Sequence, residues 1–343
     1  MNSVQAATGV PTLADIFAAR QRIVGTAIRT PLVPSQYLSK ASGNDFLLKL
    51  EITQPTGAFK LRGAANAVFA LPDNVAGIVC CSTGNHGRSA AFAARKRGLK
   101  AVVCMSALVP EAKVEGIRAL GAEIRIIGRS QDEALAESLR LRDQDGLAEI
   151  SPFDDALVIA GQGTIGLEIL EERPDVETLL VPLSGGGLAA GIAIAAKAIK
   201  PAVRVVGVSM DRGAAMEASI RARHPVEVTE VASLADSLGG GIGLDNRFSF
   251  AICRDLLDDI VLVSEEEIYH AMQTLYYEER LVAEGASVVG IAALQAGKLA
   301  SLSGPAATIV TGRNLDMKLF TEIMRGADID LGGTHIKGRR YGE

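Results

Sequence analysis

ETLLVPLSGGGLAAGIAIAAKAI, residues 177–199, contains a predicted strand, a glycine loop and a predicted helix in direct succession. The apolar run 177–183 is typical of a buried strand, and the small apolar residues 188–199 are typical of a buried helix. Residues 178–196 carry no charge, which is nearly the length of a membrane span. Pro182 and three consecutive glycines interrupt that run, so it predicts a strand, a turn and a helix instead.

The same succession recurs along the chain. Short β-branched runs alternate with amphipathic stretches that begin at capping residues and end near glycines. Such alternation predicts an α/β fold with mostly parallel sheets flanked by helices. Strands are expected at 77–81, 100–105, 123–127, 204–210 and 307–310, and helices at 87–98, 110–121, 130–146 and 264–280. Residues from 332 onward are rich in glycine and arginine and suggest a surface tail.

Composition excludes several classes of function. The 343 residues carry a net charge of −5, contain no tryptophan and include only 4% aromatic residues, so nothing favours a nucleic-acid or anionic-membrane partner. The N-terminus lacks the layout of a signal peptide. Cys80, Cys81, Cys104 and Cys253 form no CxxC pair, so we interpret them as reduced core residues of a cytoplasmic protein.

The first segment with chemical potential is Pro55-Thr56-Gly57-Ala58-Phe59-Lys60-Leu61-Arg62-Gly63-Ala64, a loop that opens a helix. Lys60 has an apolar neighbour on each side. Desolvation of its ammonium would lower its pKa and make the amine a better nucleophile. The alternative is an ordinary surface lysine near a helix start, and this segment alone does not exclude it.

The second segment, Ser82-Thr83-Gly84-Asn85-His86-Gly87, directly follows a predicted strand. Backbone amides and hydroxyls at a helix N-terminus favour an anion. An ordinary turn with Ser82 or Thr83 as the helix cap is an equal alternative. We interpret His86 as a capping or core histidine rather than a general base.

The third segment, Ser184-Gly185-Gly186-Gly187-Leu188, lies between the strand and the helix of residues 177–199. Three glycines let backbone amides approach a phosphate closely. The segment matches neither GxGxxG nor GxxxxGK[ST], so it favours a cofactor monophosphate over a nucleotide. A tight crossover turn without a ligand is the alternative.

Together with Thr311-Gly312-Arg313-Asn314, these segments resemble the fold-type II pyridoxal-phosphate family of threonine dehydratases, serine dehydratases and serine racemases. The resemblance spans residues 16–317. It implies the tryptophan synthase β-like fold, with two lobes that each hold a mostly parallel sheet flanked by helices. The large cofactor-binding domain would comprise residues 1–53 and 153–343, and the small domain with the substrate-binding loop residues 54–152. A homodimer is also expected.

The resemblance assigns a role to each segment. Lys60 would carry pyridoxal 5'-phosphate as a Schiff base and later take the Cα proton of the substrate. Thr311 would face the pyridine nitrogen, which a hydroxyl leaves unprotonated. The remaining expected contacts are Phe59 and Asn85 with the cofactor ring, Ser184, Gly185, Gly186, Gly187 and Leu188 with its phosphate, and Ser82, Thr83, Asn85, His86 and Arg313 with an amino-acid substrate.

Four departures from the family pattern narrow the prediction. Thr83 stands where racemases place a serine base, and Arg313 replaces a glycine. Ser209-Met210-Asp211 replaces the glutamate segment of cation-binding members, so no metal is predicted. Ala58 replaces a serine or asparagine.

A finer resemblance, to the dehydratases of ectoine and hydroxyectoine utilisation, rests on Thr83-Gly84-Asn85-His86-Gly87-Arg88, Val181-Pro182-Leu183-Ser184, Thr311-Gly312-Arg313-Asn314 and the segment 235–243. It implies β-elimination from a β-hydroxy-α-amino acid in hydroxyectoine catabolism. A generic L-threonine or L-serine dehydratase and a serine racemase-like enzyme are the alternatives. A nicotinamide-dependent oxidoreductase is disfavoured because GxGxxG is missing, and a binding protein on this fold is disfavoured because Lys60 is present.

Overall fold

The computed structural model describes residues 9–82, 84–107, 109, 111–129 and 131–343, and it contains two large sheets. The larger sheet has the order β1-β2-β10-β7-β8-β9, in which only β1 runs antiparallel to its neighbour. Its strands are β1 (Leu32–Pro34), β2 (Phe46–Leu50), β10 (Ala306–Val310), β7 (Thr178–Pro182), β8 (Arg204–Met210) and β9 (Asp259–Val263). The predicted α/β class is confirmed.

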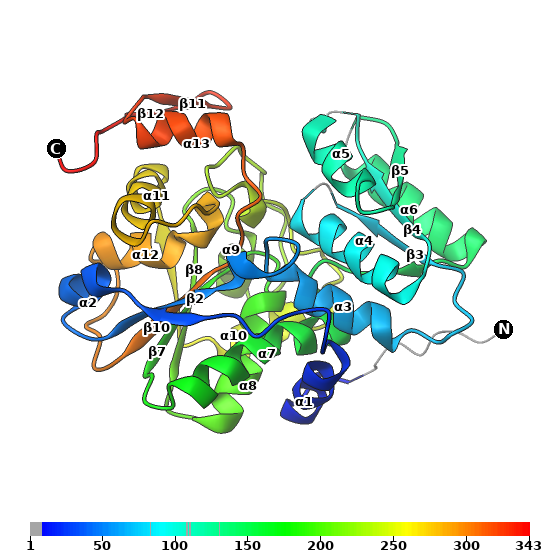
Figure 1. Cartoon of the computed structure of the whole chain (residues 1–343), viewed down its shortest axis with the longest axis horizontal. Coiled ribbons are helices and arrows are strands. Elements are labelled where there is room, and N and C mark those ends of the chain that lie inside the picture. Colours follow the sequence, from blue (N-terminus) through cyan, green and yellow to red (C-terminus); the bar gives the residue numbers. More distant parts are fainter. Residues whose placement is uncertain (1–8, 83, 108, 110, 130) are drawn as a thin grey trace.

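Helices cover both faces of this sheet (Figure 1). Successive residues of each strand alternate between two apolar clusters: Leu179 and Val181 pack with one set of helices, whereas Leu180 packs with the other. The first set comprises α1 (Leu13–Arg22), α7 (Ala156–Glu172), α8 (Gly187–Ile199), α9 (Ala215–Ala222) and α10 (Ser249–Leu256). The second comprises α2 (Gln36–Ser42), α11 (Glu265–Glu279), α12 (Val289–Gln295) and α13 (Met317–Met324).

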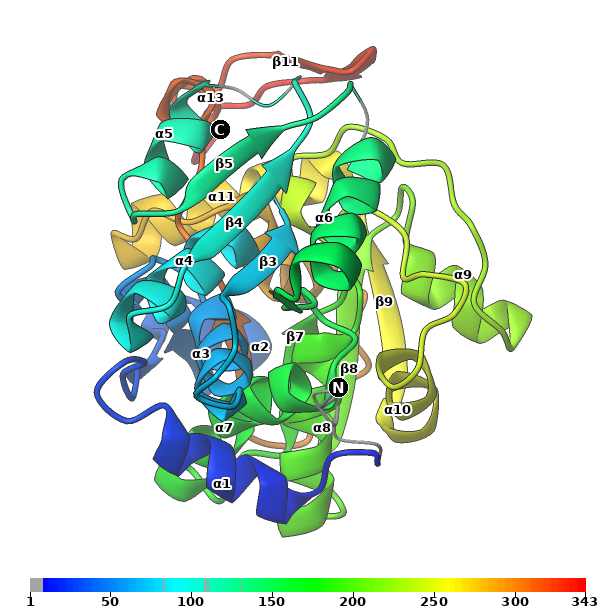
Figure 2. The same ribbon diagram turned by 90° about the vertical axis from the view of Figure 1, so that its right-hand side faces the viewer.

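The smaller sheet is wholly parallel and has the order β5-β4-β3-β6. Figure 2 shows β5, β4 and β3 side by side. It consists of β5 (Glu123–Ile126), β4 (Ala101–Met105), β3 (Ile78–Cys81) and β6 (Ala148–Glu149), with α3 (Lys60–Ala70), α4 (Asn85–Arg97), α5 (Glu111–Arg118) and α6 (Gln131–Asp145) around it. The expected starts of the last two helices at Pro110 and Ser130 lie outside the described residues. The boundaries of the two domains stay a prediction.

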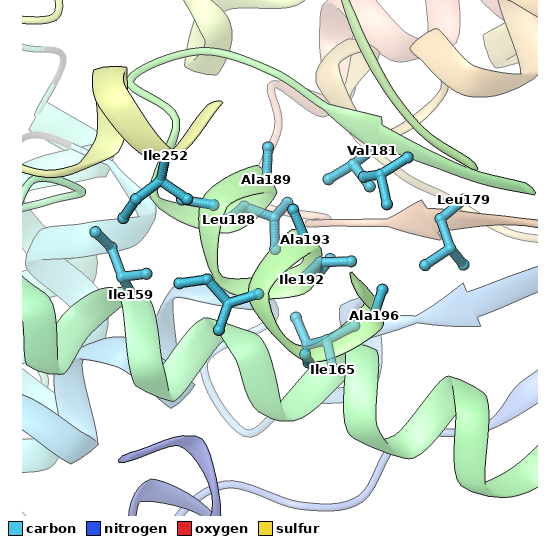
Figure 3. Packing of buried hydrophobic residues seen from close by; sticks show 14 of the residues in the cluster. Ile159, Ile165, Leu179, Val181, Leu188, Ala189, Ile192, Ala193, Ala196 and Ile252 are labelled. Atoms are coloured by element: carbon cyan, nitrogen blue, oxygen red, sulfur yellow. The ribbon is translucent and has the colours of Figure 1, made fainter. Parts of the chain in front are cut away.

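The segment 177–199 folds as predicted, into strand β7, a loop and helix α8. Figure 3 shows α8 packed among Ile159 and Ile165 of α7 and Leu179 and Val181 of β7. Small residues are needed there, because a Cβ on Gly191 of α8 would overlap the backbone of α7. Among the described residues, no helix is both long and apolar enough to cross a membrane.

The C-terminal residues are more ordered than expected. β11 (Ile329–Leu331) and β12 (Thr334–Ile336) form an antiparallel hairpin, and Ile336 is fully buried. Gln273 of α11 donates to the carbonyl of Arg339 at 2.8 Å. Most residues from 332 onward lie at the surface as predicted, but the hairpin and the burial of Ile336 were not foreseen, because an isolated apolar residue gives no periodic signal.

Candidate active site

The site forms where the carboxyl ends of three neighbouring parallel strands meet. β10 lies between β2 and β7 and is parallel to both, so the segments that follow these strands emerge at one edge of the sheet. Short 3₁₀ helices, η1 (Glu51–Thr53), η2 (Asp236–Leu238) and η3 (Gly285–Ser287), lie in the connections. A main-chain hydrogen bond joins the segment after β2 to the segment after β10, because Phe59 N donates to Thr311 O at 2.9 Å.

Lys60 is the first residue of α3 and is half-buried. Its Nζ donates to the carbonyl of Pro152 at 2.6 Å and lies 5.4 Å from the centre of the Phe59 ring. Burial without a carboxylate partner lowers the pKa of Lys60 to about 8. The expected desolvation of this amine is therefore present, and the surface-lysine alternative is wrong.

The glycine loop before α8 offers unpaired backbone amides. Within the described residues, the N–H groups of positions 184–188 donate to no protein acceptor. Gly186 has a left-handed φ of 88°, and a Cβ on Gly187 would lie 2.7 Å from the carbonyl oxygen of Phe153. Tight packing thus explains why glycine is needed, and the free amides at the start of α8 make the loop suited to a phosphate.

Asn85, at the start of α4, belongs to a network that sequence inspection missed. Its Nδ2 donates to both carboxylate oxygens of Glu284 at 3.0 Å, and its Oδ1 accepts from Asn314 Nδ2 at 2.6 Å. Glu284 also accepts from Asn314 N at 2.7 Å, and burial raises the pKa of its carboxyl group. The network fixes the orientation of the Asn85 amide.

His86 is a buried neutral histidine. Its Nε2 lies 2.7 Å from the carbonyl of Ile150 and must donate, so Nδ1 is left with a lone pair and no protein partner among the described residues. Burial, together with the charge of Lys60, lowers the pKa of His86 to about 3. A histidine with this pKa is a poor general base near neutral pH, in agreement with its interpretation as a core residue.

Thr311 follows β10 and is buried, with its Oγ1 3.0 Å from Ser287 Oγ. Ser287, on η3, was also missed by the sequence analysis, because nothing in the sequence links position 287 to position 311.

A larger feature that the sequence analysis missed is a buried cluster of four charged side chains packed against the first turn of α3. It comprises Lys49, Glu51, Arg62 and Glu168.

The other predicted residues are less enclosed. Ser82 is half-buried, and its Oγ accepts from Gly84 N at 3.3 Å. Thr83 lies outside the described residues. Arg313 is exposed, and its N donates to Gly57 O at 2.9 Å, which keeps it beside the segment that leads to Lys60. No cluster of potential metal ligands occurs among the residues that the structure describes.

Three of the four cysteines, Cys80, Cys104 and Cys253, are buried thiols of low reactivity. Burial raises the pKa of Cys104 to about 11 and that of Cys253 to about 12, and Arg254 beside Cys253 pairs with Asp255. A thiol with so high a pKa is not a nucleophile at neutral pH.

Comparison with known proteins decides the family. The model of the family described as pyridoxal-phosphate dependent enzyme matches residues 23–312. This chain belongs to that family. A threonine dehydratase homologue of Sinorhizobium fredii is 53% identical over 92% of this chain and 96% of its own. The L-threonine ammonia-lyase of Thermotoga maritima is 38% identical over 91% and 78%.

Solved structures agree. Maize serine racemase superposes with a TM-score of 0.86 at 32% identity, covering 92% of this chain and 97% of the racemase. The expected fold-type II architecture is thereby confirmed. The chain is a pyridoxal-phosphate-dependent lyase of the threonine dehydratase type.

Pyridoxal phosphate fits the residues at this edge of the sheet. Lys60 offers a partly desolvated amine, and the loop at 184–188 offers unpaired amides. The buried Thr311 hydroxyl and the unpaired Nδ1 of His86 are polar groups that a polar ligand could satisfy. Bound there, the cofactor supplies an electron sink for the substrate's Cα–H bond.

The lowered pKa of Lys60 predicts how fast the cofactor-free protein takes up pyridoxal phosphate at different pH. Only the neutral amine attacks an aldehyde, so the rate should rise with pH up to about 8 and then level off. Stopped-flow absorbance between pH 6.5 and 10 measures this rate. A rate that still climbs towards pH 10, as an ordinary lysine would give, contradicts the lowered pKa.

Proposed function

We propose that the protein catalyses β-elimination from a β-hydroxy-α-amino acid larger than threonine, formed by ring opening of hydroxyectoine. Lys60 carries the cofactor, and its amine takes the Cα proton once the substrate has displaced it. Thr311 faces the ring nitrogen, and the amides of residues 184–188 hold the phosphate. Departure of the β-hydroxyl followed by hydrolysis gives a 2-oxo acid and ammonia.

The unpaired side chain of Arg313 supports a substrate larger than threonine. Its side chain is exposed, and among the described residues it forms no ion pair. The nearby acid, Asp316, instead caps α13 by accepting from Lys318 N at 2.8 Å. The Cγ of Arg313 lies near Gly57. A guanidinium without a protein partner is suited to bind a second carboxylate or an amide oxygen of the substrate.

Arg88 does not contribute to this proposal, although it follows the Asn85 segment. Its guanidinium packs over Gly116 of α5, within the helices that surround the smaller sheet. Selection of the substrate is therefore proposed to rest on Arg313.

Arg313→Gly tests the proposal. Loss of one charge-assisted hydrogen bond of about 1.5–3 kcal/mol should reduce kcat/KM for the ring-opened substrate about ten- to a hundredfold, with little effect on L-threonine or L-serine. Arg223→Gly is the matched control, because Arg223 is exposed at the end of α9 and has a φ of 65° that glycine adopts easily. Turnover is followed by 2-oxo acid detection.

If L-threonine is by far the best substrate and Arg313→Gly leaves that ranking unchanged, the generic dehydratase is the correct function. Hydroxyectoine itself is the further comparison, since its intact ring has no primary amine to react with the cofactor.

We also propose that the enzyme is a cytoplasmic homodimer. The buried thiols of Cys80, Cys104 and Cys253, none in a disulfide, support a reducing compartment. Light scattering on the purified protein measures the mass.

A further inference from the structure

Three groups in a row extend away from the position proposed for the ring nitrogen. Thr311 Oγ1 lies 3.0 Å from Ser287 Oγ, and Ser287 Oγ lies 2.9 Å from the carbonyl oxygen of Gly312. Ser287 is fully buried and Thr311 is 5% exposed, so each hydroxyl hydrogen needs an acceptor inside the protein or on the cofactor.

A backbone hydrogen bond limits the further hydrogen bonds that the Ser287 hydroxyl can form. Gly312 N donates to Ser287 Oγ at 2.8 Å, which occupies one lone pair and leaves one lone pair and one hydrogen. The carbonyl of Gly312 already accepts from Glu284 N at 3.0 Å. The Gly312 carbonyl oxygen can therefore accept the Ser287 hydroxyl hydrogen as a second hydrogen bond, but it does not need that bond.

Two hydrogen-bond directions satisfy every group. In one, Ser287 donates to Thr311, and Thr311 donates to a ring nitrogen that carries no proton. In the other, a ring nitrogen that has gained one proton from solvent donates to Thr311, Thr311 donates to Ser287, and Ser287 donates to Gly312 O. Each hydroxyl keeps a single hydrogen in both directions, so only the ring nitrogen differs in proton count.

We propose that Ser287 is a positioning residue that lets the Thr311 hydroxyl serve the ring nitrogen either as donor or as acceptor. This inference rests on the proposed contact between Thr311 and the ring. A threonine alone would favour the unprotonated nitrogen, because its hydrogen has no other acceptor among the described residues. Ser287 supplies a second acceptor for that hydrogen. The enzyme can therefore hold the cofactor in two protonation states that differ in electron-withdrawing strength.

The charged groups that flank this row are Glu284, which begins the turn into η3, Lys60 on α3 and Asp236 on η2. Exchange of Ser287 for another neutral residue alters none of these charges. The effect of a Ser287 variant therefore reports the hydroxyl row itself.

Ser287→Ala removes the acceptor for the Thr311 hydrogen and should favour the unprotonated state of the ring nitrogen. With cofactor labelled by ¹⁵N at the ring nitrogen, NMR should show the titration midpoint about 0.5–1 pH unit lower than in the wild type. The share of turnovers that end in transamination should fall about three- to tenfold. If Ser287→Ala folds poorly, Ser287→Cys is the substitute variant. Its thiol retains a weak acceptor for Gly312 N, and we expect the titration midpoint to shift in the same direction.

Two further variants separate the possible outcomes. Ser219→Ala is the matched control, because Ser219 is also fully buried and accepts a backbone hydrogen, from Val226 N at 3.1 Å, but lies on α9. Thr311→Val removes the hydroxyl that links Ser287 to the ring, so adding Ser287→Ala to it should cause no further shift.

A wild-type midpoint in Ser287→Ala, together with a shifted midpoint in Thr311→Val, overturns the inference and leaves the proposed function intact. Wild-type midpoints in both variants mean that Thr311 does not face the ring. In that case the inference fails together with this part of the proposed function, while attachment at Lys60 is tested separately.

Discussion

Lys60→Ala should abolish both covalent attachment of pyridoxal phosphate and turnover. The variant loses the amine that binds the cofactor and the base that takes the Cα proton; loss of a general base alone lowers kcat about 10²–10⁴-fold. Borohydride reduction followed by mass spectrometry should find the adduct on Lys60 of the wild type and no adduct in the variant. The visible absorption band of the bound cofactor should disappear in parallel.

Lys96→Ala is the control for this experiment, because Lys96 is an exposed lysine at the far end of α4. It should keep the adduct, the absorption band and the wild-type rate. An adduct on any lysine other than Lys60 would rule out the assignment, whatever the activity of the variant.

Glu168→Ala should cause the largest loss of stability among single substitutions near the site. Glu168, on α7, accepts from Lys49 Nζ and from Arg62 Nη1, each at 2.6 Å, and Arg62 also pairs with Glu51 at 2.8 Å. The four buried side chains carry two positive and two negative charges. Removing one carboxylate leaves an uncompensated buried cation, which costs about 3–5 kcal/mol of unfolding free energy. Denaturant unfolding measures this loss.

Glu171→Ala provides a control on the same helix. Glu171 pairs with Arg20 and Arg29, but its side chain is 38% exposed, so its loss should change stability by less than about 1 kcal/mol. Equal losses in the two variants would mean that the buried cluster contributes no more than a surface pair.

Acid pH should reduce the difference between wild type and Glu168→Ala. Burial opposes ionisation of Glu168, but Arg62 and Lys49 outweigh it, and the pKa of the carboxyl group lies below its ordinary value of 4.5. The folded state therefore releases this proton more readily than the unfolded chain does. The stabilisation is complete above pH 4.5 and is lost as the pH falls through the folded-state pKa.

The cluster also explains how the position of Lys60 is fixed. Arg62 lies two residues after Lys60 on the first turn of α3, and its guanidinium is held by Glu51 after β2 and by Glu168 on α7. The start of α3 is thereby attached both to the larger sheet and to the helix that covers it. A loss of rigidity here would reach Lys60 directly.

The sequence alone determined the α/β class, because apolar periodicity and glycine position are local properties. Strand β7, the loop and helix α8 follow from residues 177–199, and Ser264 with Glu267 forms the capping box predicted for α11. Lys60, Asn85, the glycine loop and Thr311 were named because the four segments together resemble a known family. Each segment by itself left an ordinary turn or a surface residue open as an alternative.

Only the tertiary structure decided which of these residues meet and what supports them. The order β2-β10-β7 brings Lys60, Thr311 and the glycine loop to one edge, although their segments are separated by more than a hundred residues. Glu284 and Ser287 had no local signal, because an isolated glutamate or serine gains a role only through partners distant in sequence. The charges of Lys49, Arg62 and Glu168 suggest surface positions by themselves. They are stable in the interior because the fold assembles them into a neutral, fully hydrogen-bonded cluster, which no single segment encodes.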